Sequence, residues 1–188
     1  MTEPPTAPRV SVIAGPTGVG KGTVVARLRT LHPDLFISIS ATTRPPRPGE
    51  LHGVHYYFVT DTEFDDLLAN DGLLEWALVH GSARYGTPRG PVDDAIDEGR
   101  SVILEIDIQG ARQVRRSYPT AQQIFIAPPS WDELVRRLAG RGTESPEQQE
   151  RRLATARDEM DAADEFDHVV VNRTVEDTVR DLVTLLGL

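Results

Sequence analysis

Short apolar runs and amphipathic segments alternate along the 188 residues of this chain. Continuous apolar runs are typical of buried strands, whereas apolar residues three and four positions apart are typical of helices. The apolar runs predict strands at residues 10–14, 36–40, 54–59, 73–80, 101–107, 124–127 and 168–172. The segments between them predict helices at residues 21–31, 60–70, 92–98, 109–117, 130–140, 147–163 and 175–185.

This alternation predicts a three-layer α/β fold with a mainly parallel central sheet. Ligands of such folds bind beyond the carboxyl ends of the strands. Thr60 with Glu63, and Ser130 with Glu133, have the spacing of capping boxes at two helix starts.

The middle of the chain, residues 40–88, is rich in predicted strands and is expected to form a small lobe of its own. Residues 42–50 contain three prolines and a glycine, so we expect an irregular loop there. Residues 85–88, Tyr-Gly-Thr-Pro, are typical of a turn.

Composition narrows the range of partners. The net charge of −9 argues against general affinity for nucleic acid or membranes. The chain has no cysteine, which excludes disulfides and thiolate metal sites. No apolar stretch approaches the roughly 20 residues that span a bilayer, and the polar, proline-rich residues 1–8 lack a signal-peptide core. We expect a disordered tail, a single domain and a cytoplasmic protein.

A glycine-rich turn carries the strongest chemical signal. Gly15, four further residues, Gly20 and Lys21 have the spacing of a phosphate-binding loop, with a predicted strand before it and a predicted helix after it. The glycines let backbone N–H groups point at a phosphate, and the helix N-terminus adds its free donors. By itself the loop indicates only that a nucleoside triphosphate binds, and we expect the whole loop to contact it, namely Gly15, Pro16, Thr17, Gly18, Val19, Gly20, Lys21, Gly22 and Thr23.

Two features of this loop bear on its chemistry. Lys21 is the single lysine among 20 basic residues, so a compact ammonium group is kept where the β- and γ-phosphates need one. Gly22 stands where serine or threonine usually coordinates Mg²⁺. This departure argues against direct coordination by the loop, and no protein residue is assigned as a metal ligand.

The loop at residues 42–50 indicates a second anion site. Arg44 and Arg47 lie three positions apart on a segment stiffened by prolines, and two guanidinium groups at that spacing can grip one phosphate. Tyr56 and Tyr85 can donate hydroxyl hydrogen bonds to the same phosphate. The alternatives are solvated surface arginines and tyrosines that pack in the core or at a sheet edge.

Glu75 interrupts an apolar predicted strand, where carboxylates seldom lie without a partner. Guanine presents two parallel N–H donors that one carboxylate can accept, whereas adenine presents an acceptor at N1. Ser40 and Thr87 can complete the contacts to the base. The alternative is an edge-strand residue that faces water.

Six segments follow the phosphate loop in order: SISATTRPPRPGE, HYYF, EWALVHG, YGTP, LEIDIQG and GRGTE. Together they resemble guanylate kinase over nearly the whole chain after Pro8. The resemblance implies a three-layer P-loop kinase fold that transfers the γ-phosphate of ATP to GMP or dGMP, with Mg²⁺, in purine nucleotide metabolism. The implied parts are a tail at 1–8, a core at 9–38, 90–137 and 158–188, a GMP-binding lobe at 39–89 and a helical lid at 138–157.

The resemblance also assigns roles to single residues. The lid arginines Arg137, Arg141 and Arg152 would act in catalysis with Lys21, and Asn172 and Arg173 would contact the adenine of ATP. The GMP phosphate is assigned to Arg44, Arg47, Tyr56 and Tyr85, and guanine to Ser40, Glu75 and Thr87, with Glu105 and Asp107 facing the same site.

The sequence departs from the family pattern in two further places, and two other functions compete with this one. Glu105 replaces the usual aspartate, and one extra residue before Tyr85 predicts a reshaped loop at residues 81–84. Another small P-loop kinase, acting on a different monophosphate or a sugar phosphate, and a non-catalytic peptide-binding guanylate-kinase-like module are the competing functions. The oligomeric state, monomer or homodimer, is left open, and neither nucleic acid nor membrane is expected as a partner.

Overall fold

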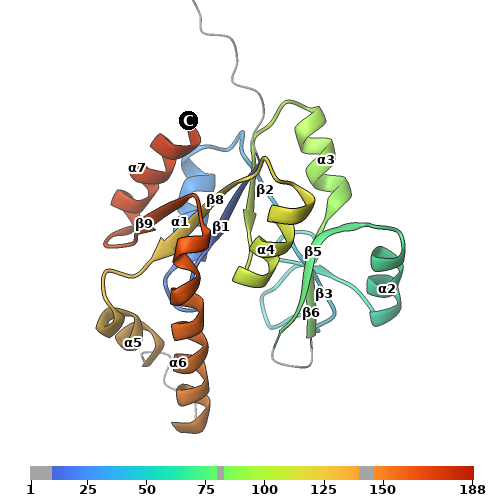
Figure 1. Cartoon of the computed structure of the whole chain (residues 1–188). Coiled ribbons are helices and arrows are strands. Elements are labelled where there is room, and N and C mark those ends of the chain that lie inside the picture. The colour runs from blue at the N-terminus through green and yellow to red at the C-terminus, as the bar shows by residue number, and fades with distance from the viewer. Residues whose placement is uncertain (1–9, 80–82, 140–145) are drawn as a thin grey trace, which may run out of the picture. The chain divides into compact units, whose positions relative to one another are not determined.

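The structure is a computed structural model that describes residues 10–79, 83–139 and 146–188 (Figure 1). The predicted tail and Arg141 lie outside the described residues. The strands are β1 (Val10–Ala14), β2 (Phe36–Ile37), β3 (Ala41–Thr42), β4 (Tyr57–Phe58), β5 (Leu73–Val79), β6 (Ala83–Pro88), β7 (Val102–Glu105), β8 (Gln122–Ala127) and β9 (His168–Val171). The helices are α1 (Lys21–Leu31), α2 (Asp61–Ala69), α3 (Arg89–Asp97), α4 (Ile108–Ser117), α5 (Trp131–Ala139), α6 (Pro146–Asp161) and α7 (Val175–Leu186), with a 3₁₀ turn η1 (Ala162–Glu165).

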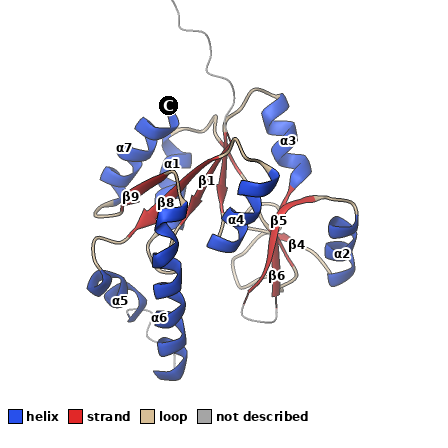
Figure 2. Cartoon of the chain, in the orientation of Figure 1, coloured by secondary structure: helices blue, strands red, loops and turns tan. Residues whose placement is uncertain are grey.

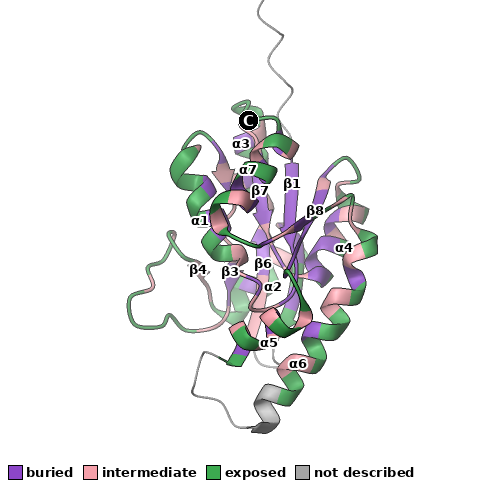
Figure 3. Cartoon of the chain, turned by 90° about the vertical axis from the view of Figure 1, so that its left-hand side faces the viewer, coloured by how far each residue is buried: buried purple, intermediate pink, exposed green. Residues whose placement is uncertain are grey.

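One sheet has five strands in the order β2-β7-β1-β8-β9. β1 pairs with β8, β8 with β9, and β2 with β7, and each of these pairs is parallel. All five residues of β1 are buried, as the purple colour in Figure 3 shows, because strands inside a parallel sheet are covered on both faces. The predicted α/β fold with a mainly parallel sheet is confirmed.

A second sheet has four strands in the order β4-β3-β6-β5 (Figure 2). β6 pairs antiparallel with both β3 and β5, while β3 and β4 are parallel. Helix α2 packs on this sheet through Phe64, which forms a buried cluster with Ala41 and Leu73. The predicted capping box of Thr60 and Glu63 at the start of α2 is confirmed.

Three local predictions were wrong or only partly right. Residues 85–88 belong to β6 and not to a turn. Gly86 is required by crowding, since a Cβ there would lie 2.8 Å from the Glu75 carbonyl oxygen on the neighbouring strand. The predicted strand 36–40 is shorter in the structure, because only residues 36–37 pair with β7, and the next strand begins at residue 41 in the other sheet. The predicted strand 54–59 shrinks to β4, since the amides of residues 54 and 55 turn back onto the carbonyl of Leu51.

The described chain divides into two compact units. One contains Val10 and residues 34–104 and 109–121, and the other contains residues 11–33, 105–108 and 122–188. The predicted boundaries of core, lobe and lid stay a prediction. Among the described residues, no helix is both long and apolar enough to cross a membrane.

Candidate functional site

The glycine-rich turn connects β1 to α1. Gly15, Gly18 and Gly20 have φ angles of +148°, +83° and +101°. Residues with a side chain adopt such positive φ angles only with strain. A Cβ at Gly15 would meet the carbonyl oxygen of Ile126, and one at Gly18 would lie 2.6 Å from Leu138 Cδ2. Conformation and space together therefore demand glycine at the positions where the spacing predicted it.

Lys21 folds back onto this turn. Its ammonium group donates to the carbonyl oxygens of Gly15 at 2.6 Å and Pro16 at 3.3 Å. The ammonium is buried, although the residue as a whole is of intermediate exposure, and this burial lowers the pKa of Lys21, while the charges of Glu159, Glu105 and Asp107 oppose the shift. A phosphate would supply further negative charge to this ammonium.

Glu159, on α6, is a loop contact that sequence reasoning missed. The backbone N–H of Thr17 donates to Glu159 Oε2 at 2.8 Å. The two residues are 142 positions apart, and no local pattern connects them. A carboxylate on this amide shows that the turn accepts an oxyanion at Thr17.

The carbonyl of Val19 is held by two side chains from distant elements. Arg137, on α5, donates to it at 2.9 Å, and Asn172, after β9, donates to it at 2.8 Å. The other end of the Asn172 amide accepts from Thr178 at 2.9 Å. A Cβ at Gly20 would lie 2.8 Å from Asn172 Nδ2. The predicted roles of Arg137 and Asn172 at ATP stay predictions, and in this structure both residues fix the loop.

Arg173 and the remaining lid arginine are also placed. Arg173 is exposed beside the buried Asn172. Arg152 is half-buried on α6, the long helix that follows α5 in Figure 1. Their predicted roles stay predictions.

Glu105, the last residue of β7, and Asp107, two positions beyond it, lie in the same unit as the loop. Burial raises the pKa of Glu105, and the charges of Lys21 and Arg29 partly offset this. A Cβ at Gly22 would lie 3.5 Å from Glu105 Oε1. The longer acid thus sits beside the loop position that lacks a hydroxyl. A role of Glu105 or Asp107 toward GMP stays a prediction.

The other unit brings together most of the predicted phosphate ligands of GMP. Arg44 Nε donates to the Tyr85 hydroxyl at 3.0 Å, and its guanidinium lies 5.3 Å from the centre of the Tyr56 ring. The Tyr56 and Tyr85 rings meet edge to face at 5.8 Å. Arg47 is exposed on the adjoining loop.

A carboxylate that sequence reasoning missed holds this arginine cluster. Glu50 accepts two hydrogen bonds from Arg44, at 2.8 and 2.9 Å, and one from the Arg47 amide at 2.7 Å. The hydrogen bond with Arg44 is the main cause that lowers the pKa of Glu50 to about 2, and the Arg47 amide adds to it. Its position in the segment RPPRPGE was the available signal, but a carboxylate next to arginines reads equally well as a surface ion pair.

Two predicted guanine contacts are paired in the structure. Glu75, on β5, is buried with 6% of its surface exposed, and Thr87 on β6 is fully buried. The Thr87 hydroxyl donates to Glu75 Oε1 at 2.7 Å. Glu75 therefore lies on the edge strand β5 of this sheet, but its side chain does not face water. Ser40, half-buried just before β3, accepts the Tyr57 amide through its carbonyl.

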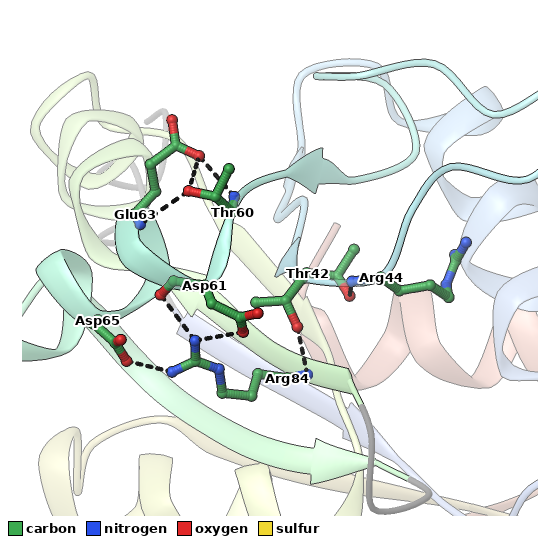
Figure 4. A network of polar contacts seen from close by, with 8 residues as sticks. Thr42, Arg44, Thr60, Asp61, Glu63, Asp65 and Arg84 are labelled. Carbon is green, nitrogen blue, oxygen red and sulfur yellow. Dashed lines mark hydrogen bonds and ion pairs between the residues drawn. The ribbon is translucent and has the colours of Figure 1, made fainter.

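A separate arginine network in the same sheet ties β6 to α2 (Figure 4). Arg84 forms ion pairs with Asp61 and Asp65 and lies over the Phe64 ring at 4.7 Å. Residues 83 and 84 form part of β6, while residues 80–82 lie outside the described residues, so the predicted reshaping of 81–84 stays a prediction. We interpret this network as one that stabilises the packing of α2 on β6 and that does not bind substrate.

Comparison with known proteins gives a consistent result. A family model described as guanylate kinase matches residues 7–187. The guanylate kinase of Cutibacterium acnes is 62% identical over 179 residues, which cover 95% of this chain and 90% of that protein. The guanylate kinase of Streptomyces coelicolor is 61% identical over 186 residues, 98% of this chain and 94% of that one. The crystal structure of guanylate kinase from Anaplasma phagocytophilum, at 33% identity, matches with a TM-score of 0.78 over 97% of this chain and 86% of that chain.

Proposed function

Since the chain belongs to the guanylate kinase family, we propose that it transfers the γ-phosphate of ATP to GMP and releases ADP and GDP. The observation that carries GMP as the acceptor is the buried pair of Glu75 and Thr87. The two oxygens of a buried carboxylate match the paired N–H donors of guanine and disfavour the N1 acceptor of adenine. The alternatives, another small-molecule kinase or a peptide-binding module, are not favoured by relatives at this level of identity.

On the donor side, the turn between β1 and α1 binds the phosphates of ATP. Its backbone amides and the α1 N-terminus are preorganised for an anion. Lys21 leaves the carbonyls of Gly15 and Pro16 to neutralise charge on the transferring group. Arg137 and Asn172 keep the turn in shape through Val19.

On the acceptor side, Arg44, Arg47, Tyr56 and Tyr85 bind the phosphate of GMP, while Ser40, Glu75 and Thr87 read the base. Phosphoryl transfer needs in-line placement and charge neutralisation more than covalent help. The GMP phosphate is already ionised, so no general base is required. Arg141 and Arg152 add positive charge near the transferring group when the lid closes.

Mg²⁺ fits this arrangement as a companion of ATP. Gly22 offers no hydroxyl, and within the described ranges no group of three or more histidine or acidic residues could form a metal cage. Mg²⁺ commonly keeps several waters and binds through nucleotide phosphates and one or two carboxylates, and Glu105 lies beside Gly22. When bound, the ion would neutralise charge on the phosphates of ATP, and Glu105 would face its water shell.

The finer parts of the proposal follow from the same assignment. We propose dGMP as a second acceptor, because none of the proposed contacts involves the ribose 2′-hydroxyl. The protein would recycle GMP in purine metabolism in the cytoplasm, without nucleic acid or membrane as a partner.

A substrate panel tests the proposal. ADP release is followed with ATP and Mg²⁺ in the presence of GMP, dGMP, AMP, CMP, UMP or a sugar phosphate, one at a time. The proposal expects turnover with GMP and dGMP and at most trace turnover with the rest. Preferred turnover of another acceptor would overturn it.

A further inference from the structure

One carboxylate organises both arginines that the proposed function assigns to the GMP phosphate. Glu50 accepts Arg44 in a bidentate pair at 2.8 and 2.9 Å, and the same side chain accepts the Arg47 amide at 2.7 Å. The side chains of Arg44 and Glu50 are only 14% and 18% exposed. Bidentate, partly buried pairs of this kind fix geometry far better than exposed ion pairs do.

The position of Glu50 follows from the local sequence. The Glu50 amide donates to the Arg47 carbonyl at 3.0 Å and closes a four-residue turn. Pro48 takes the second position of this turn and Gly49, with φ at +87°, takes the third, as a type II turn requires. The turn returns the Glu50 side chain to the amide of Arg47, so a short rigid segment sets where the carboxylate lies.

Arg44 is largely committed within this cluster. Of its five N–H donors, one goes to the Tyr85 hydroxyl, two go to Glu50 and one goes to the Pro45 carbonyl. One donor is left for a phosphate, so Arg44 cannot bind the phosphate through two N–H groups. The Arg47 side chain, by contrast, is exposed and forms no hydrogen bond or ion pair with any described residue.

We propose that Glu50 is a positioning residue for the acceptor phosphate, an inference that rests on the proposed function. Glu50 holds Arg44 against Tyr85 and Tyr56, where it contributes one N–H. Through the turn, Glu50 also directs the Arg47 guanidinium, which supplies the bidentate contact. Glu50 does not touch the phosphate itself.

If Glu50 has this role, removing its carboxylate should weaken the binding of the GMP phosphate, which is the opposite of what the change in net charge alone predicts. Loss of the Glu50 carboxylate makes the cluster more positive, which by charge alone would tighten phosphate binding. Glu50→Gln retains one acceptor but turns an amide N–H₂ toward a guanidinium N–H, so Arg44 must leave its place. Glu50→Asp keeps the charge but is one methylene too short to hold Arg44 and the Arg47 amide together.

The test compares the binding of GMP and guanosine by calorimetry. Guanosine lacks the phosphate, so its affinity reports only base and ribose contacts and shows that the base site is folded. Asp65→Asn is the matched control, because it removes an ion pair between α2 and β6 that lies outside the cluster. Both Glu50 variants should weaken GMP by about 10- to 100-fold, the value of one or two charged hydrogen bonds, and leave guanosine unchanged. In turnover, KM for GMP should rise while KM for ATP does not.

Each other outcome overturns the inference in a recognisable way. Unchanged or tighter GMP binding in Glu50→Gln would mean that Glu50 merely competes with the phosphate. Equal loss of GMP and guanosine would mean a general structural role, and a loss in Asp65→Asn as well would mean the same. Failure of the wild-type protein to bind GMP would overturn the proposed function itself.

Discussion

The substitution Glu75→Gln tests whether the buried carboxylate of Glu75 recognises the guanine base of GMP. The wild-type carboxylate has two oxygens, and Oε1 accepts the Thr87 hydroxyl at 2.7 Å. The pair is buried, so a mismatch there is not relieved by water. The substitution keeps the size of the side chain and removes its charge and one acceptor.

The size of the effect depends on how the new amide is oriented. If its oxygen keeps the Thr87 hydroxyl, its N–H₂ group faces the donors of guanine, and a charged hydrogen bond is lost while a buried mismatch is added. If it turns over, Thr87 accepts instead, and guanine keeps one neutral hydrogen bond. The two cases bracket a loss of about 2–4 kcal/mol, or roughly 30- to 1,000-fold in kcat/KM for GMP.

The assay measures kcat/KM for GMP and AMP in the wild type and the variant. Adenine presents an acceptor at N1 and a donor at N6, which a glutamine can satisfy, so activity on AMP should fall far less or rise. An unchanged ratio of GMP to AMP activity would refute the reasoning and move base recognition to other residues. Thr87→Val, which removes the hydroxyl that holds Glu75, should give a smaller change in the same direction.

Three further predictions concern the turn and the arginine cluster. Lys21→Ala should lower kcat by at least about 100-fold, as for loss of one preorganised donor, with an unchanged circular dichroism spectrum; full activity would show that the ammonium is not used. Gly20→Ala and Gly99→Ala both place alanine at positive φ, which costs about 1–2 kcal/mol, but only Gly20 also meets Asn172 within 2.8 Å, so its melting temperature and ATP affinity should fall more, and equal losses would contradict the clash. Because the pKa of Glu50 is lowered to about 2 from 4.5, its charge stabilises the fold above pH 4.5 and this effect is lost as pH falls toward 2; the difference in melting temperature between wild type and Glu50→Gln should therefore be constant from pH 5 to 8 and shrink below pH 4.5, and a difference that grows on acidification would contradict the ion pair.

The parts of the site that sequence reasoning located are those defined by local spacing. The turn at Gly15–Lys21 needs glycine for backbone reasons that act within a few residues, so its pattern is visible in the chain. Glu75 was recognisable because a carboxylate in an apolar run demands a partner, and Thr87 proved to be that partner. The capping box of Thr60 and Glu63 was also predictable, because its two residues lie three positions apart.

The missed features depend on pairing across long sequence separations. Glu159 accepts the Thr17 amide only because α6 returns to the loop. The Val19 carbonyl accepts hydrogen bonds from Arg137 on α5 and from Asn172 after β9. Gly86 was wrongly predicted as a turn residue. A glycine required by the close approach of a neighbouring strand and a glycine required by a turn look alike in sequence.

The most direct test of the central account is the stoichiometry of the reaction. Purified protein is incubated with ATP, Mg²⁺ and GMP, and the nucleotides are separated by chromatography, with a parallel incubation that lacks GMP. The account predicts GDP and ADP in equal amounts and almost no ADP without GMP. ADP formation that does not depend on GMP, or loss of ATP without GDP, would contradict it.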